Sequence, residues 1–247
     1  MGGHLIIGIV ALCFSLGASA AEVRVAVAAN FTHTLAQLQT QFEKSTPHRV
    51  VIISGATGKL FAQISNAAPF DVLLSADAEA PTRLVQAGLA VAPSQFTYAR
   101  GRLVLWSLQP ELVRDAAQSL RAITTQRIAL ANPKHAPYGR AAEQALRALQ
   151  LWDTVKSRIV LGENVNQTLH FAATGNATWA LVGLAQVLSL PAEQRGGYWE
   201  VPRDLYEPIT QDAVLLVRGR DNPAAQEFLA YLRSAAAREL IQRAGYE

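Results

Sequence analysis

Short apolar runs alternate with amphipathic stretches along most of the chain. The apolar runs predict strands at Ala21–Ala28, Val50–Ile53, Asp71–Ser75, Leu103–Trp106, Ile128–Ala131, Ile159–Leu161, Trp179–Val182 and Ala213–Val217. The amphipathic stretches predict helices at Thr32–Ser45, Gly58–Asn66, Ala80–Ala87, Leu112–Ile123, Gly139–Leu149, Asn166–Ala173 and Pro223–Ser234, followed by a terminal helical stretch. Strands that alternate with helices of this length indicate βαβ units, so we predict an α/β fold with mostly parallel sheets flanked by helices.

Two further expectations concern details of these elements. The helix over 58–66 is expected to turn Leu60, Phe61 and Ile64 toward the core, because these positions share one helical face. The segment Pro191–Pro208 is rich in Gly, Pro and Glu and is predicted to be a loop.

The first twenty residues have the pattern of a secretory signal peptide. An apolar run covers Leu5–Gly17 and is followed by the small residues Ala18–Ala20, although no Lys or Arg precedes the run. The run is too short to span a membrane, so we expect export with cleavage after Ala20. A lipoprotein site at Cys13 is disfavoured because Leu12 stands where a small residue is expected.

Composition and charge restrict the class of protein. The chain has 247 residues, of which 50% are hydrophobic and 17% charged, and this composition excludes a disordered or fibrous protein. Its one cysteine excludes a disulfide scaffold and a thiolate-rich metal site. The formal net charge is +3, but the basic residues do not cluster, which argues against a nucleic-acid partner.

Polar residues gather where predicted strands give way to helices. These junctions contain Asn30, Thr57, Tyr138 and the segment Glu163–Asn166. In an α/β sheet, ligands bind outside the carboxyl ends of the strands, where helix N-termini present unpaired N–H groups. Hydroxyl and amide side chains at the same place add neutral donors. The pattern therefore favours an anion held by dipoles and hydrogen bonds.

Each junction also has an alternative interpretation that involves no ligand. Asn30 and Thr57 are residue types that commonly cap helices. The pair Tyr138–Gly139 is compatible with turn chemistry alone, and Gly55 and Gly58 are compatible with a tight turn.

Other chemical motifs fail on inspection. The stretch Gly55–Leu60 (GATGKL) resembles part of a phosphate-binding P-loop, but Ile53 and Leu60 occupy positions where that loop needs Gly and Ser or Thr. The chain has no G-x-S-x-G or H-E-x-x-H motif. We therefore do not expect a nucleotide site or a zinc-dependent hydrolase.

Catalytic and metal-binding clusters are not expected either. The histidines outside the leader show no metal-ligand spacing, and Asp71 and Asp77 form at most a weak carboxylate pair with structural roles. The sequence offers no nucleophile paired with a base. We predict that the protein is not an enzyme.

Several stretches together resemble one protein family. They are VAVAANFT (25–32), SGATGKLFAQI (54–64), APFDVLLSAD (68–77), ANPKHAPYGRAAEQAL (131–146), GENV (162–165) and the closing FLAYLRS and GYE segments. In their order and spacing they are similar to the periplasmic molybdate-binding proteins of ABC importers, which have the type II periplasmic-binding-protein fold.

The resemblance implies an oxyanion-binding site, and this sequence differs from some relatives at one position of that site. Members of the family bind a tetrahedral oxyanion through backbone N–H groups and hydroxyls, without a neutralising cation. By position, the donors here are Asn30, Thr57, Tyr138 and the backbone of Val165. Molybdenum would be bound only as its oxyanion, and no cofactor is implied. Some relatives place a ligand-binding tyrosine late in the chain, where this sequence has Leu184, so Tyr138 is expected to supply that hydroxyl.

The resemblance also implies architecture and function. The expected domains are a signal peptide (1–20), lobe 1 (21–101 plus 208–247) and lobe 2 (102–207), with the ligand in the cleft between the lobes. The expected function is periplasmic binding of molybdate, and of tungstate, by a monomer that delivers the ion to an inner-membrane ABC permease. Sulfate or phosphate as ligand, and a sensory module that serves no transporter, remain as alternatives.

Overall fold

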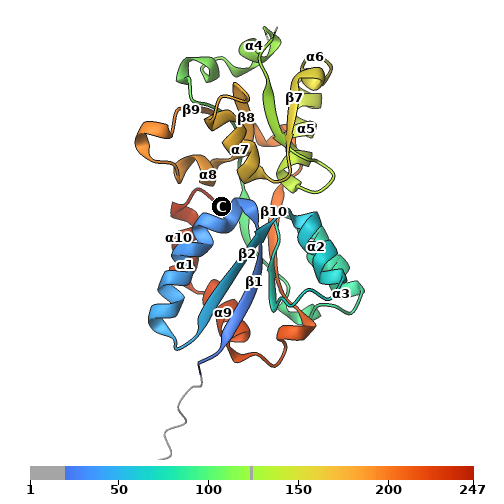
Figure 1. Cartoon of the computed structure of the whole chain (residues 1–247), viewed down its shortest axis with the longest axis vertical. Helices are drawn as coiled ribbons and strands as arrows, with labels where there is room; N and C mark the ends of the chain where they lie inside the picture. Colours follow the sequence, from blue (N-terminus) through green and yellow to red (C-terminus); the bar gives the residue numbers. More distant parts are fainter. Residues whose placement is uncertain (1–19, 123–124) are drawn as a thin grey trace, which may run out of the picture.

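The computed structural model describes residues 20–122 and 125–247. The predicted signal peptide therefore lies outside the described residues, except for Ala20. Two five-stranded sheets, each flanked by helices, form two lobes stacked along the long axis of the molecule (Figure 1). The fold is the two-lobed α/β arrangement that the sequence predicts.

The sheet of lobe 1 has the strand order β2-β1-β3-β10-β4. Its strands are β1 (Glu22–Ala28), β2 (Arg49–Gly55), β3 (Val72–Leu74), β4 (Phe96–Gly101) and β10 (Ile209–Leu215). The neighbours of β1 pair with it in parallel, whereas β10 is antiparallel to both β3 and β4. The strands linked by helices are thus parallel, and the antiparallel pairs involve strands near the crossing between lobes.

The sheet of lobe 2 repeats this plan with the order β7-β6-β8-β5-β9. Its strands are β5 (Leu103–Ser107), β6 (Ile128–Ala131), β7 (Ile159–Gly162), β8 (Trp179–Gly183) and β9 (Gly197–Glu200). Strand β6 is parallel to β7 and β8, and β5 is antiparallel to β8 and β9.

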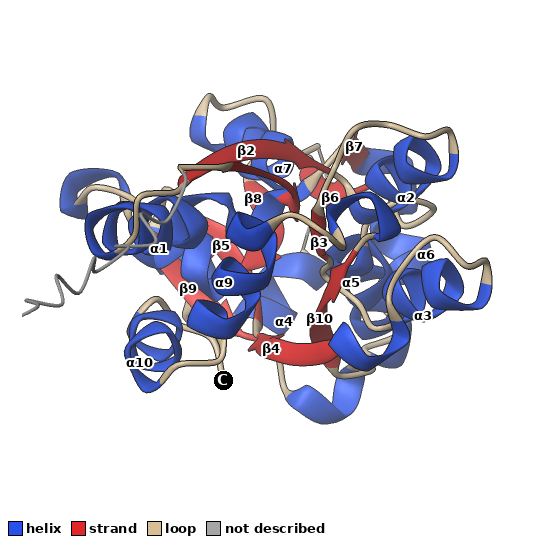
Figure 2. Ribbon diagram, turned by 90° about the horizontal axis from the view of Figure 1, so that it is seen from below, coloured by secondary structure: helices blue, strands red, loops and turns tan. Residues whose placement is uncertain are grey.

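Helices surround the strands of both sheets, as the view along the long axis shows (Figure 2). The helices of lobe 1 are α1 (Thr32–Ser45), α2 (Thr57–Ser65), α3 (Glu79–Gln86), α9 (Pro223–Leu232) and α10 (Ala235–Arg243). Those of lobe 2 are α4 (Ala116–Arg121), α5 (Pro137–Ala148), α6 (Trp152–Val155), α7 (Val165–Ala173) and α8 (Leu184–Leu188). In the described part of the chain, no helix is long and apolar enough to cross a membrane.

The chain crosses between the lobes twice. It leaves lobe 1 after β4, which ends at Gly101, and returns through the segment between β9 and β10. Gly101 pairs with Ile209 at the start of β10, so the two crossings lie side by side. The first and last parts of the chain consequently share one lobe, as the blue and red segments in the lower part of Figure 1 show.

Several sequence predictions need correction. The segment predicted as a loop over Pro191–Pro208 contains β9, because these residues pair with the edge of β5. The helix predicted over Leu112–Ile123 is a 3₁₀ turn, Pro110–Val113, followed by α4; Ile123 lies outside the described residues. The last predicted strand ends early, because Val217 begins another 3₁₀ turn.

Side-chain burial follows the predicted helical faces with one difference. Leu60 and Ile64 of α2 are buried as expected. Phe61 is only half-buried, and the Arg83 guanidinium lies 4.5 Å from the centre of its ring. Its ring therefore packs beneath a neighbouring cation on the surface of lobe 1 instead of entering the core.

Candidate functional site

A cavity lies between the lobes where helices from both begin. Its lining residues are Ala28, Ala29, Asn30, Gly55, Ala56, Thr57, Ala76, Ala136, Pro137, Tyr138, Asn164 and Val165. It is small, with a cavity volume of about 10 Å³. All the residues that the sequence nominates as donors line this one cavity, and none of the described residues lining it carries a charge.

The cavity is positioned by the topology. Strands β1 and β2 are parallel, as are β6 and β7, and the next element along the chain after each of these strands is a helix or a helical turn. The carboxyl ends of these strands face the other lobe, so the first turns of α2, α5 and α7 converge with the 3₁₀ turn Ala29–Phe31. Each helix N-terminus contributes a partial positive charge of about half a proton charge to the cavity.

Asn30 lies in the 3₁₀ turn after β1 and is buried. Its side-chain Nδ2 donates to Gln211 Oε1 over 2.8 Å and to the Tyr246 hydroxyl over 3.3 Å. No side-chain cap is present at the start of this turn or of α1. The capping interpretation of Asn30 is therefore wrong, and its side chain belongs to a buried polar network behind the cavity.

Thr57 is the first residue of α2, after the N-cap residue Ala56. It is not an N-cap, so this alternative is also wrong. Its Oγ1 accepts a hydrogen bond of 3.1 Å from the backbone N–H of Ala76. A hydroxyl that accepts an N–H in this way retains its own proton for donation. Thr57 can therefore present an O–H donor to the cavity.

Tyr138 follows Pro137 in the first turn of α5. The N–H groups of Gly139 and Arg140 donate to the Ala136 carbonyl, and Pro137 has no N–H, which leaves the Tyr138 amide as the free donor of this turn among the described residues. Burial raises the pKa of the Tyr138 hydroxyl well above its usual range, chiefly through desolvation. The hydroxyl is therefore a neutral group at physiological pH.

The Tyr138 ring also reaches the late-chain strand that the sequence comparison with the family singled out. A Cβ added to Gly183, at the end of β8, would lie 3.2 Å from the Tyr138 hydroxyl. Leu184, which follows, is buried at the start of α8. The Tyr138 hydroxyl thus lies beside the point where β8 gives way to α8.

Val165 is the first residue of α7, and its N-cap is Asn164. The Asn164 side chain accepts from the N–H groups of Asn166 and Gln167, over 3.0 and 3.1 Å. This cap satisfies the next two amides and leaves that of Val165 facing the cavity. The family resemblance implied this backbone donor, and in the structure Val165 is the first residue of a helix.

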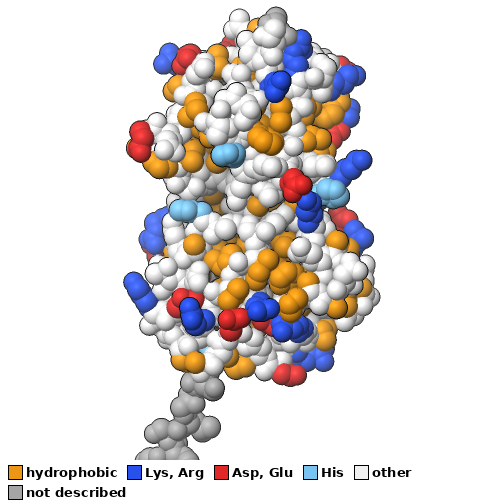
Figure 3. Space-filling view, viewed as in Figure 1, with side chains coloured by type: hydrophobic (Ala, Val, Ile, Leu, Met, Phe, Trp, Pro, Cys, Tyr) orange, Lys and Arg blue, Asp and Glu red, His pale blue; other side chains and the backbone are white. Residues whose placement is uncertain are grey.

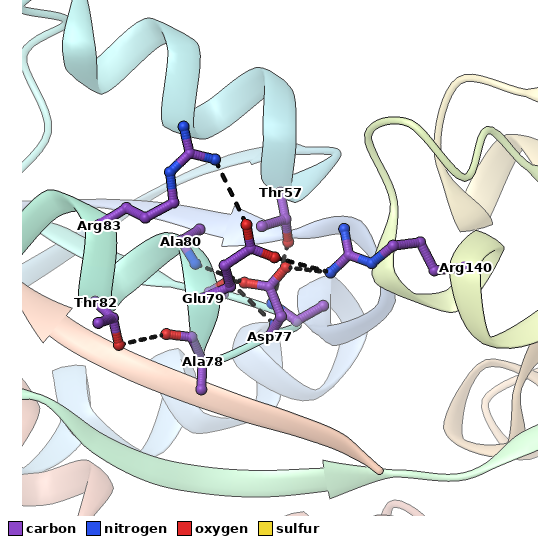
Figure 4. A network of polar contacts seen from close by, with 10 residues as sticks. Thr57, Asp77, Ala78, Glu79, Ala80, Thr82, Arg83 and Arg140 are labelled. Atoms are coloured by element: carbon purple, nitrogen blue, oxygen red, sulfur yellow. Dashed lines mark hydrogen bonds and ion pairs between the residues drawn. The ribbon is translucent and has the colours of Figure 1, made fainter. Parts of the chain in front are cut away.

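Two basic residues on helices that begin at the cavity, Lys59 of α2 and Arg140 of α5, are paired with carboxylates of the opposite lobe. Lys59 Nζ lies 2.8 Å from Glu163, and this hydrogen bond lowers the pKa of the Glu163 carboxyl. Figure 4 shows Arg140 reaching from α5 to two carboxylates of lobe 1: Asp77, at 2.8 Å, and Glu79, at 3.9 Å. We call these the rim pairs, because each of their residues stands within three positions in the sequence of a residue that lines the cavity, and each pair joins the two lobes.

Further contacts bring the lobes together around the cavity. The N–H of Gly58 donates to the His135 carbonyl over 2.9 Å, and Asn166 Nδ2 donates to the Ala29 carbonyl over 2.9 Å. The lobes are therefore in a closed arrangement, although a waist between them is visible in the space-filling view (Figure 3). On the face in that figure, Lys and Arg are scattered among acidic side chains and form no continuous patch.

Clusters of metal-ligating side chains and the two carboxylates Asp71 and Asp77 were the other candidates for chemistry. In the described ranges, no group of three or more His, Cys, Asp or Glu residues is arranged to hold a metal ion. Asp71 accepts from the Arg24 N–H and pairs with Arg218, while Asp77 accepts from the Ala80 N–H in the first turn of α3. Both carboxylates thus have the structural roles that the sequence predicted.

The fold and the interlobe cavity together define a two-lobed solute-binding protein. The chain belongs to the bacterial extracellular solute-binding protein family, whose model matches residues 23–247. It is 47% identical to the molybdate-binding protein ModA of Azotobacter vinelandii, over 98% of this chain and 96% of that protein. It is 43% identical to ModA of Rhodobacter capsulatus, over 94% and 90%. The solved structure of the Azotobacter vinelandii periplasmic molybdate-binding protein superposes with a TM-score of 0.86 at 42% identity, covering 91% of this chain and 98% of that one.

Proposed function

We propose that this protein binds molybdate in the interlobe cavity and delivers it to the permease of an ABC importer. The observation that carries the proposal is an uncharged cavity at which helix N-termini from both lobes meet hydroxyl and amide donors. The near full-length identity to two ModA proteins supports molybdate as the ligand. On this proposal the protein is a binding protein and not an enzyme.

The proposed donors come from both lobes. Asn30 and Thr57 belong to lobe 1, and Tyr138 and Val165 to lobe 2. Because Gln211 and Tyr246 take both side-chain N–H groups of Asn30, Asn30 would donate to the ligand through its backbone N–H. An oxyanion that first docks on one set gains the other only when the lobes close, so binding shifts the equilibrium toward the closed form. The lobes, with proposed limits at 101/102 and 207/208, would rotate about the two adjacent crossings. The closed form is then the one that the permease receives.

Selectivity would arise from donor type and cavity size. A site made only of donors offers no acceptor for a ligand O–H, so a protonated oxyanion such as hydrogen phosphate would leave its proton unpaired. Sulfate is fully deprotonated but smaller than molybdate, so the donors would reach it less well. Tungstate has nearly the size and charge of molybdate, and we propose that it binds as well.

Location and partners follow from the same proposal. The signal-like segment 1–20 and the periplasmic relative support export to the periplasm. We propose that the mature protein acts as a monomer, since a single chain supplies every donor of the cavity. A permease in the inner membrane is the proposed macromolecular partner.

Thermal unfolding of the mature protein with separate oxyanions tests the function. We expect molybdate and tungstate to raise the Tm, because a ligand at 100 times its Kd stabilises the folded state by about 2.7 kcal/mol. Sulfate, phosphate and chromate are expected to have smaller effects at equal concentration. A larger shift with sulfate or phosphate would identify a different oxyanion as ligand, and no shift with any of these ions would refute the proposal.

We expect the ion pairs at the rim of the cavity to make a modest contribution to the stability of the closed arrangement of the lobes. Replacing Arg140 by Gln removes the bridge to Asp77 and Glu79, and both partners are partly exposed. We expect the Kd for molybdate to rise about 2- to 5-fold, as for an exposed ion-pair network, through faster dissociation. Arg147→Gln is the matched control, because the contacts of Arg147, with Glu143 over 2.7 Å and with the Trp152 ring, both lie within lobe 2. Equal dissociation rates in the two variants would contradict the role of this pair in closure.

A further inference from the structure

Gln211 is a buried polar residue that the sequence analysis did not single out. It lies in β10, just after the chain returns from lobe 2, and its side chain is completely shielded from solvent. The pairing of β10 with β4 shifts register between Gln211 and Asp212. At this irregularity the Gln211 side chain contacts Asn30 of lobe 1 and Tyr138 of lobe 2, two residues that line the cavity.

The contacts of Gln211 fix the orientation of its amide. Its Oε1 accepts from Asn30 Nδ2 over 2.8 Å and from the Tyr98 hydroxyl over 3.2 Å. Tyr246 donates its proton to the Asn30 backbone carbonyl, so the Asn30 side-chain atom beside the Tyr246 oxygen is the donor Nδ2, and the Gln211 atom that accepts from this Nδ2 is the carbonyl oxygen. Nε2 then faces the Tyr138 hydroxyl, at 3.4 Å. Gln211 therefore bridges a site residue of lobe 1 and one of lobe 2.

The neighbouring hydroxyls reinforce this arrangement. The single Tyr98 proton is shared between Gln211 Oε1 and the Ser75 carbonyl, which lies nearer at 2.9 Å, and Tyr246 donates to the Asn30 carbonyl over 2.8 Å. Both tyrosines therefore have their protons directed at lobe 1 acceptors. Asn30 is held between Gln211 and Tyr246, and the Tyr138 oxygen receives an N–H from Gln211.

This arrangement determines which way the Tyr138 proton points. An oxygen that accepts from Gln211 is free to direct its own proton into the cavity. The Thr57 hydroxyl has the same arrangement, because its oxygen accepts a hydrogen bond from the Ala76 N–H and its proton is left for donation. We propose that Gln211 is a positioning residue that turns the Tyr138 hydroxyl into a donor toward the ligand and holds the Asn30 amide, so that the site selects a fully deprotonated oxyanion. The inference rests on the proposed function.

The surroundings of Gln211 contain few groups that titrate near neutral pH. The tyrosines around it are Tyr98, Tyr138 and Tyr246, and burial raises the pKa of each hydroxyl above its usual range, mainly by desolvation. The nearest carboxylates are Asp212, which is held by Gln95 and Thr97, and Asp77, which is held by Arg140. The wild-type network therefore keeps its hydrogen-bond directions across the neutral range.

A Gln211→Glu variant tests the inference through pH. Once ionised, the carboxylate accepts a hydrogen bond from the Tyr138 hydroxyl, turns that proton away from the cavity and places a negative charge behind the anion. We expect the Kd for molybdate to rise at least about 100-fold, which corresponds to ~2.7 kcal/mol. A protonated Glu has one O–H donor and one carbonyl acceptor, as Gln does in this network. Burial raises the pKa of such a carboxyl, so affinity should recover as the pH falls.

Calorimetry with sodium molybdate on the full mature chain, at pH values where the ion remains a dianion, provides the readout. The wild-type protein and the control Gln37→Glu, which adds the same charge at an exposed position of α1, should show a flat pH profile. A Gln211→Met variant, which keeps the length and loses the amide, should bind weakly at every pH. It also separates loss of hydrogen bonds from the effect of charge.

The outcomes separate the inference from the proposed function. If the wild-type protein does not bind molybdate, the proposed function fails. If it binds and Gln211→Glu binds equally well, or binds weakly without recovery at low pH, the positioning role of Gln211 is overturned while the function stands. Recovery in Gln211→Glu together with none in Gln211→Met supports the inference.

Discussion

Replacing Val165 by proline is expected to raise the Kd for molybdate at least about 100-fold while helix α7 remains folded. Proline removes the one backbone N–H that the Asn164 cap leaves facing the cavity. A hydrogen bond to a charged group contributes about 1.5–3 kcal/mol, and the proline ring also occupies space that the anion needs. Proline is favourable at the first position of a helix, and Asn164 has the extended backbone (φ −148°, ψ 174°) that a residue before proline requires.

Isothermal calorimetry and ligand-free thermal unfolding check this prediction together. The matched control is Ala235→Pro, which introduces proline at the equivalent position of α10, after the N-cap Ser234 and away from the cavity. We expect the control to bind molybdate as the wild-type protein does. If Val165→Pro also retained wild-type affinity, the α7 amide would not be a ligand donor.

The pattern of apolar and polar residues predicted most strands and helices because their signals are local, whereas the two-lobe arrangement came from the family resemblance. A βαβ unit produces an apolar strand followed by an amphipathic helix, and helix α1 and strand β6 have the limits that the pattern predicts. Strand β9 was missed because Gly197–Glu200 lacks a strand pattern and becomes a strand only by pairing with β5. Such tertiary pairing leaves little trace in the local sequence.

The candidate site was predictable in part for the same reason. Asn30, Thr57, Tyr138 and Val165 all follow strands, and parallel strands bring their carboxyl ends together. The orientation of these donors was not predictable. Asn30 is fixed by Gln211, 181 residues later, and by Tyr246, 216 residues later. Nothing near Asn30 in the sequence distinguishes this arrangement from an ordinary helix cap.

On the proposed function, the same buried network accounts for the binding of an anion by a basic protein without a cation. The formal net charge is +3, but Lys59 and Arg140 at the rim are committed to carboxylates of the opposite lobe. Inside the cavity, helix dipoles and oriented hydroxyls would stabilise the negative charge of the bound anion in place of a cation. We therefore expect the ion pairs to govern how the lobes close, and the neutral donors to govern which anion is retained.

Replacing Gly139 by alanine is expected to lower the free energy of unfolding by about 3 kcal/mol, the upper part of the range for overpacking. A Cβ at this position would lie 2.2 Å from the Ala131 carbonyl oxygen and 3.0 Å from the Pro133 nitrogen. Both are backbone atoms at the end of β6, so the clash cannot be relieved by rotating a side chain. The first turn of α5 has to move away from the strand.

That displacement links stability to binding, because Tyr138 precedes Gly139 in the same turn. We expect Gly139→Ala to weaken molybdate binding as well as the fold, measured by urea denaturation and by calorimetry below the unfolding temperature. Gly88→Ala serves as the control: its backbone is left-handed (φ +70°) but an added Cβ meets no atom within 4 Å, so only about 1 kcal/mol of conformational strain is expected. If the two variants lost equal stability, close packing of α5 on β6 would not be what requires glycine at 139. If Gly139→Ala were destabilised but bound molybdate normally, the donors of the α5 turn would not contribute to the site.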